Sequence, residues 1–282
     1  DAAPYAGTMT RDCSLNEILS QREFVAPDRE RADQSALAAC IAAGGNLEEL
    51  SDWGRTPLTM AAYWGDEQSL RRLIAAGADV NARRNTANHP VASMTIQDDN
   101  DMLAILLAAG SNPDGSGKRD APQPLGTAIW NNNIDGVRLL IEAGANVAIR
   151  DLSNGHSMVE RTILSDEDNG EILLMLFQAG LSPTAPLSRG RAPLERVIWK
   201  VNAGEMRALV LAGVDLNAPL GRAESALFYL TDARDMTPQL IRALVQAGAD
   251  TTQQDELGDT PYSRAQRYDP GLAVKMRQAG LR

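Results

Sequence analysis

A short phrase recurs along this chain and constrains its fold more than any other feature. Residues 73–81 read LIAAGADVN, and variants of this phrase return at 106–113, 140–147 and 210–217. A glycine marks each occurrence, and successive marker glycines lie 32 to 36 residues apart. Self-similarity at such a period is typical of stacked structural repeats, each of which contacts only its neighbours. The marker glycines are Gly44, Gly77, Gly110, Gly144, Gly180, Gly213, Gly248 and Gly280.

Each repeat is predicted to be a helix, a tight turn, a second helix and a polar loop. Thr56 and Pro57 begin the clearest repeat, since threonine caps helices and proline is tolerated in the first helical turn. Gly65 then interrupts the chain, and apolar residues at helical spacing follow. Gly77 suits the left-handed position that ends many helices. Related proline markers stand at Pro90, Pro124, Pro193 and Pro261.

The stretch from Asp52 to Asn81 resembles the ankyrin repeat family, whose pattern of D-x-x-G-x-T-P-L followed by G-A-x-x-N it nearly meets. Other repeats depart from the pattern, as where Met158 and Ala226 replace the proline. The resemblance implies an all-α, ankyrin-type α-solenoid of about seven to eight helix-turn-helix repeats with atypical ends. We expect a loose N-terminal lead-in (1–13) and a single solenoid (14–282) made of an N-terminal cap (14–50), repeats at about 51–83, 84–117, 118–150, 151–184, 185–218 and 219–252, and a C-terminal cap (253–282).

The only two cysteines, Cys13 and Cys40, both lie in the first forty residues. Cys13 precedes one expected helix and Cys40 lies on the next, so two neighbouring helices would bring the thiols within disulfide distance. The alternative is two buried thiols, since a free cysteine packs as a small hydrophobe. A disulfide would favour an oxidising compartment, and the periplasm or secretion is the expected location. Free thiols would instead favour the cytoplasm. A start at Asp1 fits either signal-peptide removal or a trimmed segment.

Composition narrows the classes of partner. The formal net charge is −10 and the chain has no run of lysine or arginine, which argues against binding of nucleic acid or of anionic membranes. No stretch approaches the roughly 18 apolar residues that span a bilayer, so no membrane insertion is expected. The acidity is compatible with a basic partner and equally with solubility alone.

No catalytic or metal-binding pattern is found in the sequence. The two histidines, His89 and His156, fall in different repeats, and neither has a carboxylate or cysteine at metal-ligand spacing. The chain has no nucleophile elbow, phosphate-binding loop or dinucleotide fingerprint. In a repeat array, distance in sequence becomes distance in space, so distant residues do not gather into a site. We therefore predict a protein that is not an enzyme and that has no metal or cofactor.

The first helices and loop tips are expected to carry the function. Columns of positions counted from the proline marker face the partner in the ankyrin family, and three of the four tryptophans fall in them although only 4% of residues are aromatic. Tryptophan, tyrosine and arginine dominate the energetics of protein interfaces. The alternative is that these rings pack between adjacent helices, and a tryptophan can do both. The predicted contact residues are Trp53, Arg55, Met60, Tyr63, Trp64, Ile96, Trp130, Asn131, Arg161, Leu164, Arg196, Trp199, Lys200, Tyr229 and Asp232.

These patterns favour a binding module that is monomeric in isolation and docks another protein, expected to be a basic or lytic enzyme. The chain resembles periplasmic ankyrin proteins of bacteria, and this resemblance implies an immunity or inhibitor protein that blocks a cognate lytic enzyme. The alternatives are an adaptor or protective factor for a periplasmic redox enzyme such as a catalase, and a secreted effector directed at a host.

Overall fold

A computed structural model describes most of the chain as two compact units, Asp1–Asn146 and Val147–Arg282, and each unit is taken here by itself. Predictions for the lead-in at 1–12, and for Ile96 and Asp232, lie outside the described residues. The division into caps and repeats of a single solenoid stays a prediction. The described residues are 13–25, 29–82, 94, 98–116, 123–151, 154–200, 202–231 and 237–282.

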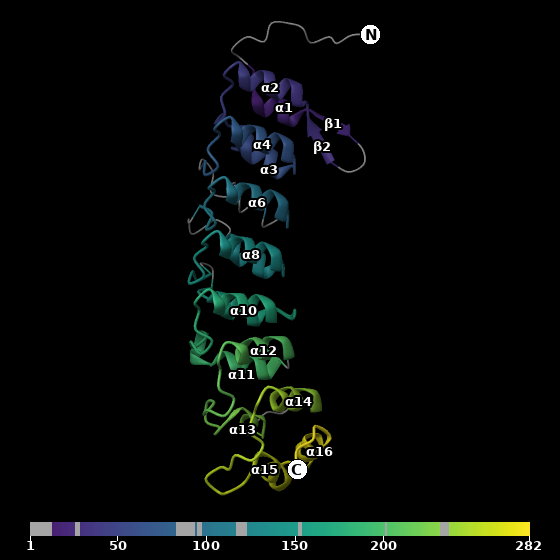
Figure 1. The fold of residues 1–282 in the computed structure, drawn as a ribbon, viewed down its shortest axis with the longest axis vertical. Helices are drawn as coiled ribbons and strands as arrows, with labels where there is room; N and C mark the ends of the chain where they lie inside the picture. Colours follow the sequence, from purple (N-terminus) through teal and green to yellow (C-terminus); the bar gives the residue numbers. More distant parts are fainter. Residues whose placement is uncertain are drawn as a thin grey trace. The chain divides into compact units, whose positions relative to one another are not determined.

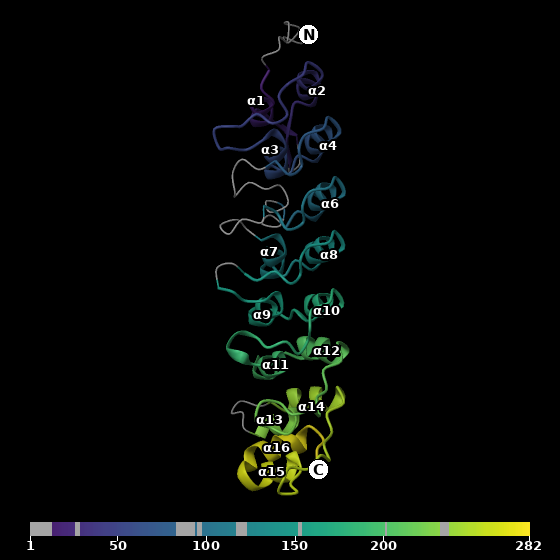
Figure 2. The same cartoon turned by 90° about the vertical axis from the view of Figure 1, so that its left-hand side faces the viewer.

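Unit 1 is a stack of helix pairs (Figure 1). Figure 2 shows its helices in two layers, with α1, α3 and α7 in one layer and α2, α4, α6 and α8 in the other. In the second layer α2 packs on α4, and α6 packs on α8. The helices of this unit are α1 (Leu15–Ser20), α2 (Gln34–Ala42), α3 (Pro57–Tyr63), α4 (Glu67–Ala75), α6 (Asn100–Ala108), α7 (Pro124–Trp130) and α8 (Ile134–Glu142).

The repeat around α3 and α4 shows why the sequence forms this unit. The Thr56 hydroxyl accepts a hydrogen bond from the Thr59 backbone N–H at 3.3 Å and caps α3. Asp66 likewise accepts from the Ser69 N–H at 3.0 Å and caps α4. Gly77 ends the second helix at φ 92°, a conformation that costs glycine little. The capping predicted from the sequence is therefore confirmed in this repeat.

Loop asparagines join successive repeats. The amide of Asn81 donates to the Gly110 carbonyl at 3.1 Å and accepts from the Asn112 N–H at 2.7 Å. Asn217 makes the same pair of bonds in unit 2, to the Gly248 carbonyl at 3.2 Å and from the Asp250 N–H at 2.7 Å. The final asparagine of the recurring phrase is thus structural, because it satisfies backbone groups of the next repeat that helix termini leave unpaired.

The N-terminal cap departs from the helical pattern. Strands β1 (Arg22–Val25) and β2 (Arg29–Ala32) pair in antiparallel register, with Arg22 opposite Ala32. The chain is helical as the sequence predicts, and this short strand pair within the N-terminal cap is an addition that the sequence analysis did not predict. The hairpin is anchored at its end, where the Ala32 N–H donates to the buried Asp66 carboxylate at 3.1 Å.

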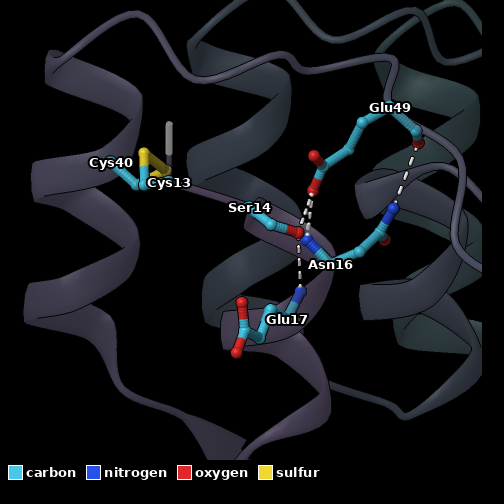
Figure 3. The surroundings of a disulfide bond; sticks show 6 residues. All are labelled: Cys13, Ser14, Asn16, Glu17, Cys40 and Glu49. Carbon is cyan, nitrogen blue, oxygen red and sulfur yellow. Dashed lines mark hydrogen bonds between the residues drawn. A yellow bond between two sulfur atoms is a disulfide. The ribbon is translucent and has the colours of Figure 1, made fainter. Parts of the chain in front are cut away.

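The cap is also fastened by a disulfide and a glutamate (Figure 3). The sulfurs of Cys13 and Cys40 are bonded, and their Cα atoms lie 5.8 Å apart, as the sequence predicts. The Ser14 hydroxyl and the Asn16 N–H both donate to Glu49 Oε1, at 2.9 and 2.5 Å. These contacts hold the short helix α1, which lies between α2 and α3 and has Leu15 and Leu19 buried.

Unit 2 repeats the arrangement of helix pairs around one apolar core, to which Leu173, Leu209 and Leu244 contribute from successive second helices. Helices α10 and α12 meet at Gly170 and Gly204, where a Cβ on Gly170 would lie 2.5 Å from the backbone carbon of Gly204. The helical elements of this unit are α9 (Met158–Leu164), α10 (Gly170–Gln178), η1 (Ser188–Gly190), α11 (Pro193–Lys200), α12 (Ala203–Leu211), α13 (Ala226–Thr231), α14 (Pro238–Gln246), α15 (Pro261–Tyr268) and α16 (Pro270–Gln278).

Candidate functional site

Large apolar side chains stand exposed where the first helix of a repeat ends. Trp130 is the last residue of α7 and is 69% exposed, and Trp199 lies one residue before the end of α11 and is 46% exposed. Trp53 precedes α3 on a loop and is 76% exposed. Tryptophan is enriched among the residues that dominate interface energetics, so indole rings exposed at a repeated position are candidate contact residues. Others at these helix ends are Tyr63 and Trp64 (α3), Leu164 (α9) and Tyr268 (α15).

The rings beside α3 form a supported cluster. The Arg55 guanidinium lies over the Tyr63 ring at 3.5 Å from its centroid, and the Tyr63 and Trp64 rings pack edge to face at 4.7 Å. The Trp64 indole N–H points to the Met60 sulfur at 3.0 Å. Met60 itself is only 5% exposed. Its predicted direct contact with a partner is therefore wrong, because it packs beneath Trp64 as core.

Trp130 and Asn131 lie beside a polar turn in unit 1. Asn131 and Asn133 both donate to Asp98 Oδ1, at 3.0 and 3.2 Å. Asn133 also exchanges two hydrogen bonds with the Asn100 amide. This network fixes the turn that follows α7, and so it fixes the direction in which the end of α7 presents its indole.

In unit 2 the predicted residues Trp199 and Tyr229 act as a pair. The Trp199 indole N–H donates to the Tyr229 hydroxyl at 2.8 Å, which links α11 to α13. The bond satisfies one polar atom of each ring and holds both rings in place. A ring fixed in this way loses little side-chain entropy on binding, which favours affinity.

Two basic residues that are predicted to contact a partner form ion pairs within unit 2. Arg161 pairs with Asp151, which is buried. Lys200 donates to Glu205 Oε1 at 2.7 Å and to the Glu167 carbonyl at 3.0 Å. Direct contact of Arg161 and Lys200 with a partner stays a prediction, and it would compete with a partly buried ion pair in each case. Arg196 is exposed on α11.

Glu205 is the buried carboxylate of that second pair. Its side chain is fully buried, and burial raises the pKa of Glu205 from 4.5 to about 7 although the bond from Lys200 acts in the opposite direction. The folded protein thus holds a proton here that the unfolded chain releases between pH 4.5 and 7. The stability that this proton contributes is present below pH 4.5 and is lost as the pH rises through 7.

A Glu205→Gln variant tests this consequence, because glutamine keeps the shape and cannot ionise. At pH 8 the variant is expected to be more stable than the wild type by about 1–3 kcal/mol, and at pH 4.5 the two should match. Urea unfolding at several pH values measures the difference. The exposed Glu142→Gln serves as the control, and a Glu205→Gln curve that runs parallel to the wild type at every pH would contradict the raised pKa.

The C-terminal part of unit 2 carries a cavity of about 460 Å³ whose lining includes four carboxylates, those of Glu224, Asp255, Glu256 and Asp269. Arg264 enters this cavity and pairs with Glu224 at 3.5 Å and with Asp255 at 3.6 Å. The exposed rims are apolar, with Leu257 and Tyr268. A surface of this kind suits a basic side chain flanked by apolar ones.

Two further observations bear on the class of protein. Within the described ranges, no three side chains among His, Cys, Asp and Glu are grouped so as to hold a metal ion. None of the helices seen in these ranges combines the length and apolar character needed to span a bilayer.

Comparison with known proteins identifies the fold. Residues 53–85 match the family model described as the ankyrin repeat. The chain folds as an ankyrin repeat domain. It is similar to the ankyrin repeat domain of Bcl-3, a member of the IkappaB family, with TM-score 0.56 and 21% identity over 79% of this chain and 98% of the other. No curated protein matches the sequence.

Other ankyrin structures are similar to the same degree. The human ASB11 ankyrin repeat domain aligns with TM-score 0.54 and 19% identity, covering 80% of this chain and 98% of that one. An ankyrin repeat domain from Acinetobacter baumannii AYE aligns with TM-score 0.57 and 24% identity, covering 64% and 93%. At these identities the likeness establishes the fold of the ankyrin chain described here, and its partner must be argued from its own surface.

Proposed function

We propose that this ankyrin protein binds another protein through the exposed apolar side chains at the ends of its first helices. Ankyrin repeats are protein–protein interaction modules. The observation that carries the proposal is the recurrence of exposed rings at two adjacent positions of the repeat, six residues after the marker proline for Trp130 and Trp199 and seven residues after it for Trp64 and Tyr268. Core packing does not explain them, because each keeps more than a third of its surface in water.

The more specific proposal is an immunity or inhibitor protein that blocks a cognate lytic enzyme in the periplasm. The bonded cysteines are compatible with an oxidising compartment, and they support this location without deciding it. A preorganised repeat stack suits tight inhibition, since little entropy is lost when it binds. The acidic cavity of the last repeat supports an enzyme with basic groups near its active site.

Capture from the native cell tests the proposal. Tagged wild-type protein, crosslinked in the cell and purified, is expected to retain one lytic enzyme whose activity falls in proportion to added protein. Capture of a catalase without loss of its activity would favour the protective role. Capture of no protein above the level of a tag-only control would contradict the binding function itself.

A further inference from the structure

Unit 2 also contains a basic pocket, and the proposed binding through exposed apolar side chains gives this pocket no role. It has a volume of about 310 Å³ and lies among the start of α9, the loop around η1 and the first helix α11. Three arginines line it, Arg189 and Arg191 from the loop and Arg196 from α11, together with His156. The walls are completed by Glu160, Leu164, Leu187 and Ser188.

The three arginines concentrate positive charge in a chain whose formal net charge is −10. In the part of the chain that the structure describes, Arg189, Arg191 and Arg196 form no ion pair, and all three are exposed. With Glu160 counted, the pocket keeps a formal charge of +2, from three arginines and one carboxylate with His156 neutral. Guanidinium groups that converge without a carboxylate partner are prepared for an anion.

The carboxylate in the pocket is already satisfied. Glu160 is buried, and it accepts hydrogen bonds from the Ser188 N–H at 3.1 Å and from the Ser188 hydroxyl at 2.7 Å. The Nε2 atom of His156 lies 3.9 Å from Glu160 Oε1. Glu160 therefore holds the loop against α9, and the arginines remain available for an incoming group.

The backbone at Arg189 gives an independent indication. Arg189 has φ 68° and ψ 17°, the left-handed region that a type II turn demands of its third residue. The turn is closed by the Gly190 N–H, which donates to the Leu187 carbonyl at 3.0 Å. Glycine would fit this position without strain, whereas an arginine there costs about 1 kcal/mol. Strain of this kind gathers at functional positions, which is consistent with a use for the arginine side chain.

The pocket walls favour a carboxylate over a phosphate. Leu164 is partly exposed and Leu187 is buried, and together they offer an apolar wall for the methylene groups of an acidic side chain. Leu164 also belongs to the exposed set at the first-helix ends, so the pocket is continuous with the proposed contact surface.

We propose that this pocket binds a carboxylate side chain of the protein partner, held by Arg189, Arg191 and Arg196 and packed against Leu164. The inference rests on the proposed function for the source of the carboxylate, while the site itself is a property of this chain. The partner is then expected to be mixed in charge, with an acidic residue that enters this pocket and basic residues elsewhere.

The test uses the full chain without any partner, so it can fail while partner binding stands. Nitrogen-15 spectra of the arginine Nε–H groups are recorded at low salt while succinate, and separately inorganic phosphate, is added. Succinate is expected to shift the signals of Arg189, Arg191 and Arg196 together in a saturable manner, with a lower Kd than phosphate. Absence of saturable shifts with succinate, or tighter binding of phosphate, would overturn the proposal.

Variants show whether the pocket itself is responsible. Combined Arg191→Gln and Arg196→Gln substitution is expected to raise the succinate Kd at least tenfold. Arg207→Gln removes the same charge from an exposed position on α12 and should change the Kd less than twofold. Arg189→Gly should raise the Kd at least threefold without lowering the melting temperature, because the turn is relieved of strain. Equal losses in Arg207→Gln, or an unchanged Kd in Arg189→Gly, would count against the three-arginine site.

Discussion

Alanine substitution of Trp130 and Trp199 together is expected to weaken partner binding by about 3 kcal/mol, more than a hundredfold in Kd. Both rings are exposed, and Trp199 is held by the Tyr229 hydroxyl, so each presents apolar area without reorganisation. Helical content should stay unchanged, because neither ring belongs to the buried core. Calorimetric titration of the captured partner measures the loss.

A matched control is available in unit 2. Leu211 is the last residue of the second helix α12 and is 65% exposed. Leu211→Ala therefore removes exposed apolar surface from a second helix and leaves the first helices unchanged. Its Kd should stay within twofold of the wild type. Equal weakening by Leu211→Ala and by the tryptophan pair would show that the effect is general to exposed apolar area and would contradict the assignment to the first helices.

Removal of the disulfide has the second large effect. Replacing Cys13 and Cys40 by serine is expected to lower the free energy of unfolding by about 3 kcal/mol, because the bond closes a loop with a sequence separation of 27. Urea unfolding measures it, and mass spectrometry without reductant should find the two cysteines linked in the wild type.

Reductant provides the control for the disulfide. Dithiothreitol should destabilise the wild type to the level of the double serine variant and leave that variant unchanged. A wild type that unfolds identically with and without dithiothreitol would mean that the bond contributes nothing. The same result would remove the support that the cysteines lend to an oxidising compartment.

The repeats were predictable because their determinants are local. A threonine before a proline, a glycine at the end of the second helix and an apolar stripe all act within one repeat, as at Thr56, Pro57 and Gly77. The disulfide between Cys13 and Cys40 was also predictable, since these are the only two cysteines of the chain and they lie at two neighbouring helices. The β-hairpin at 22–32 was not, because its anchor is the Asp66 carboxylate of the following repeat, more than 30 residues away in the sequence.

The candidate site was predictable in outline and wrong in detail for a related reason. Counting from the proline marker places Trp130 and Trp199 correctly at helix ends, but it does not show what lies opposite a side chain. Met60 is buried beneath Trp64, and Lys200 is held by Glu205 of the next helix. The arginine pocket was missed because it joins the turn at Arg189 to a different element, α11. The single available signal was the density of arginines at 189–196.

The most direct test of the binding surface is hydrogen–deuterium exchange of this protein with and without its captured partner. Peptides that contain the ends of the first helices, around Trp64, Trp130 and Trp199, should become protected on binding. Peptides from the second helices α8 and α12 should exchange at the same rate in both states. Protection confined to α8 and α12, with the tryptophan-bearing ends unchanged, would contradict the account.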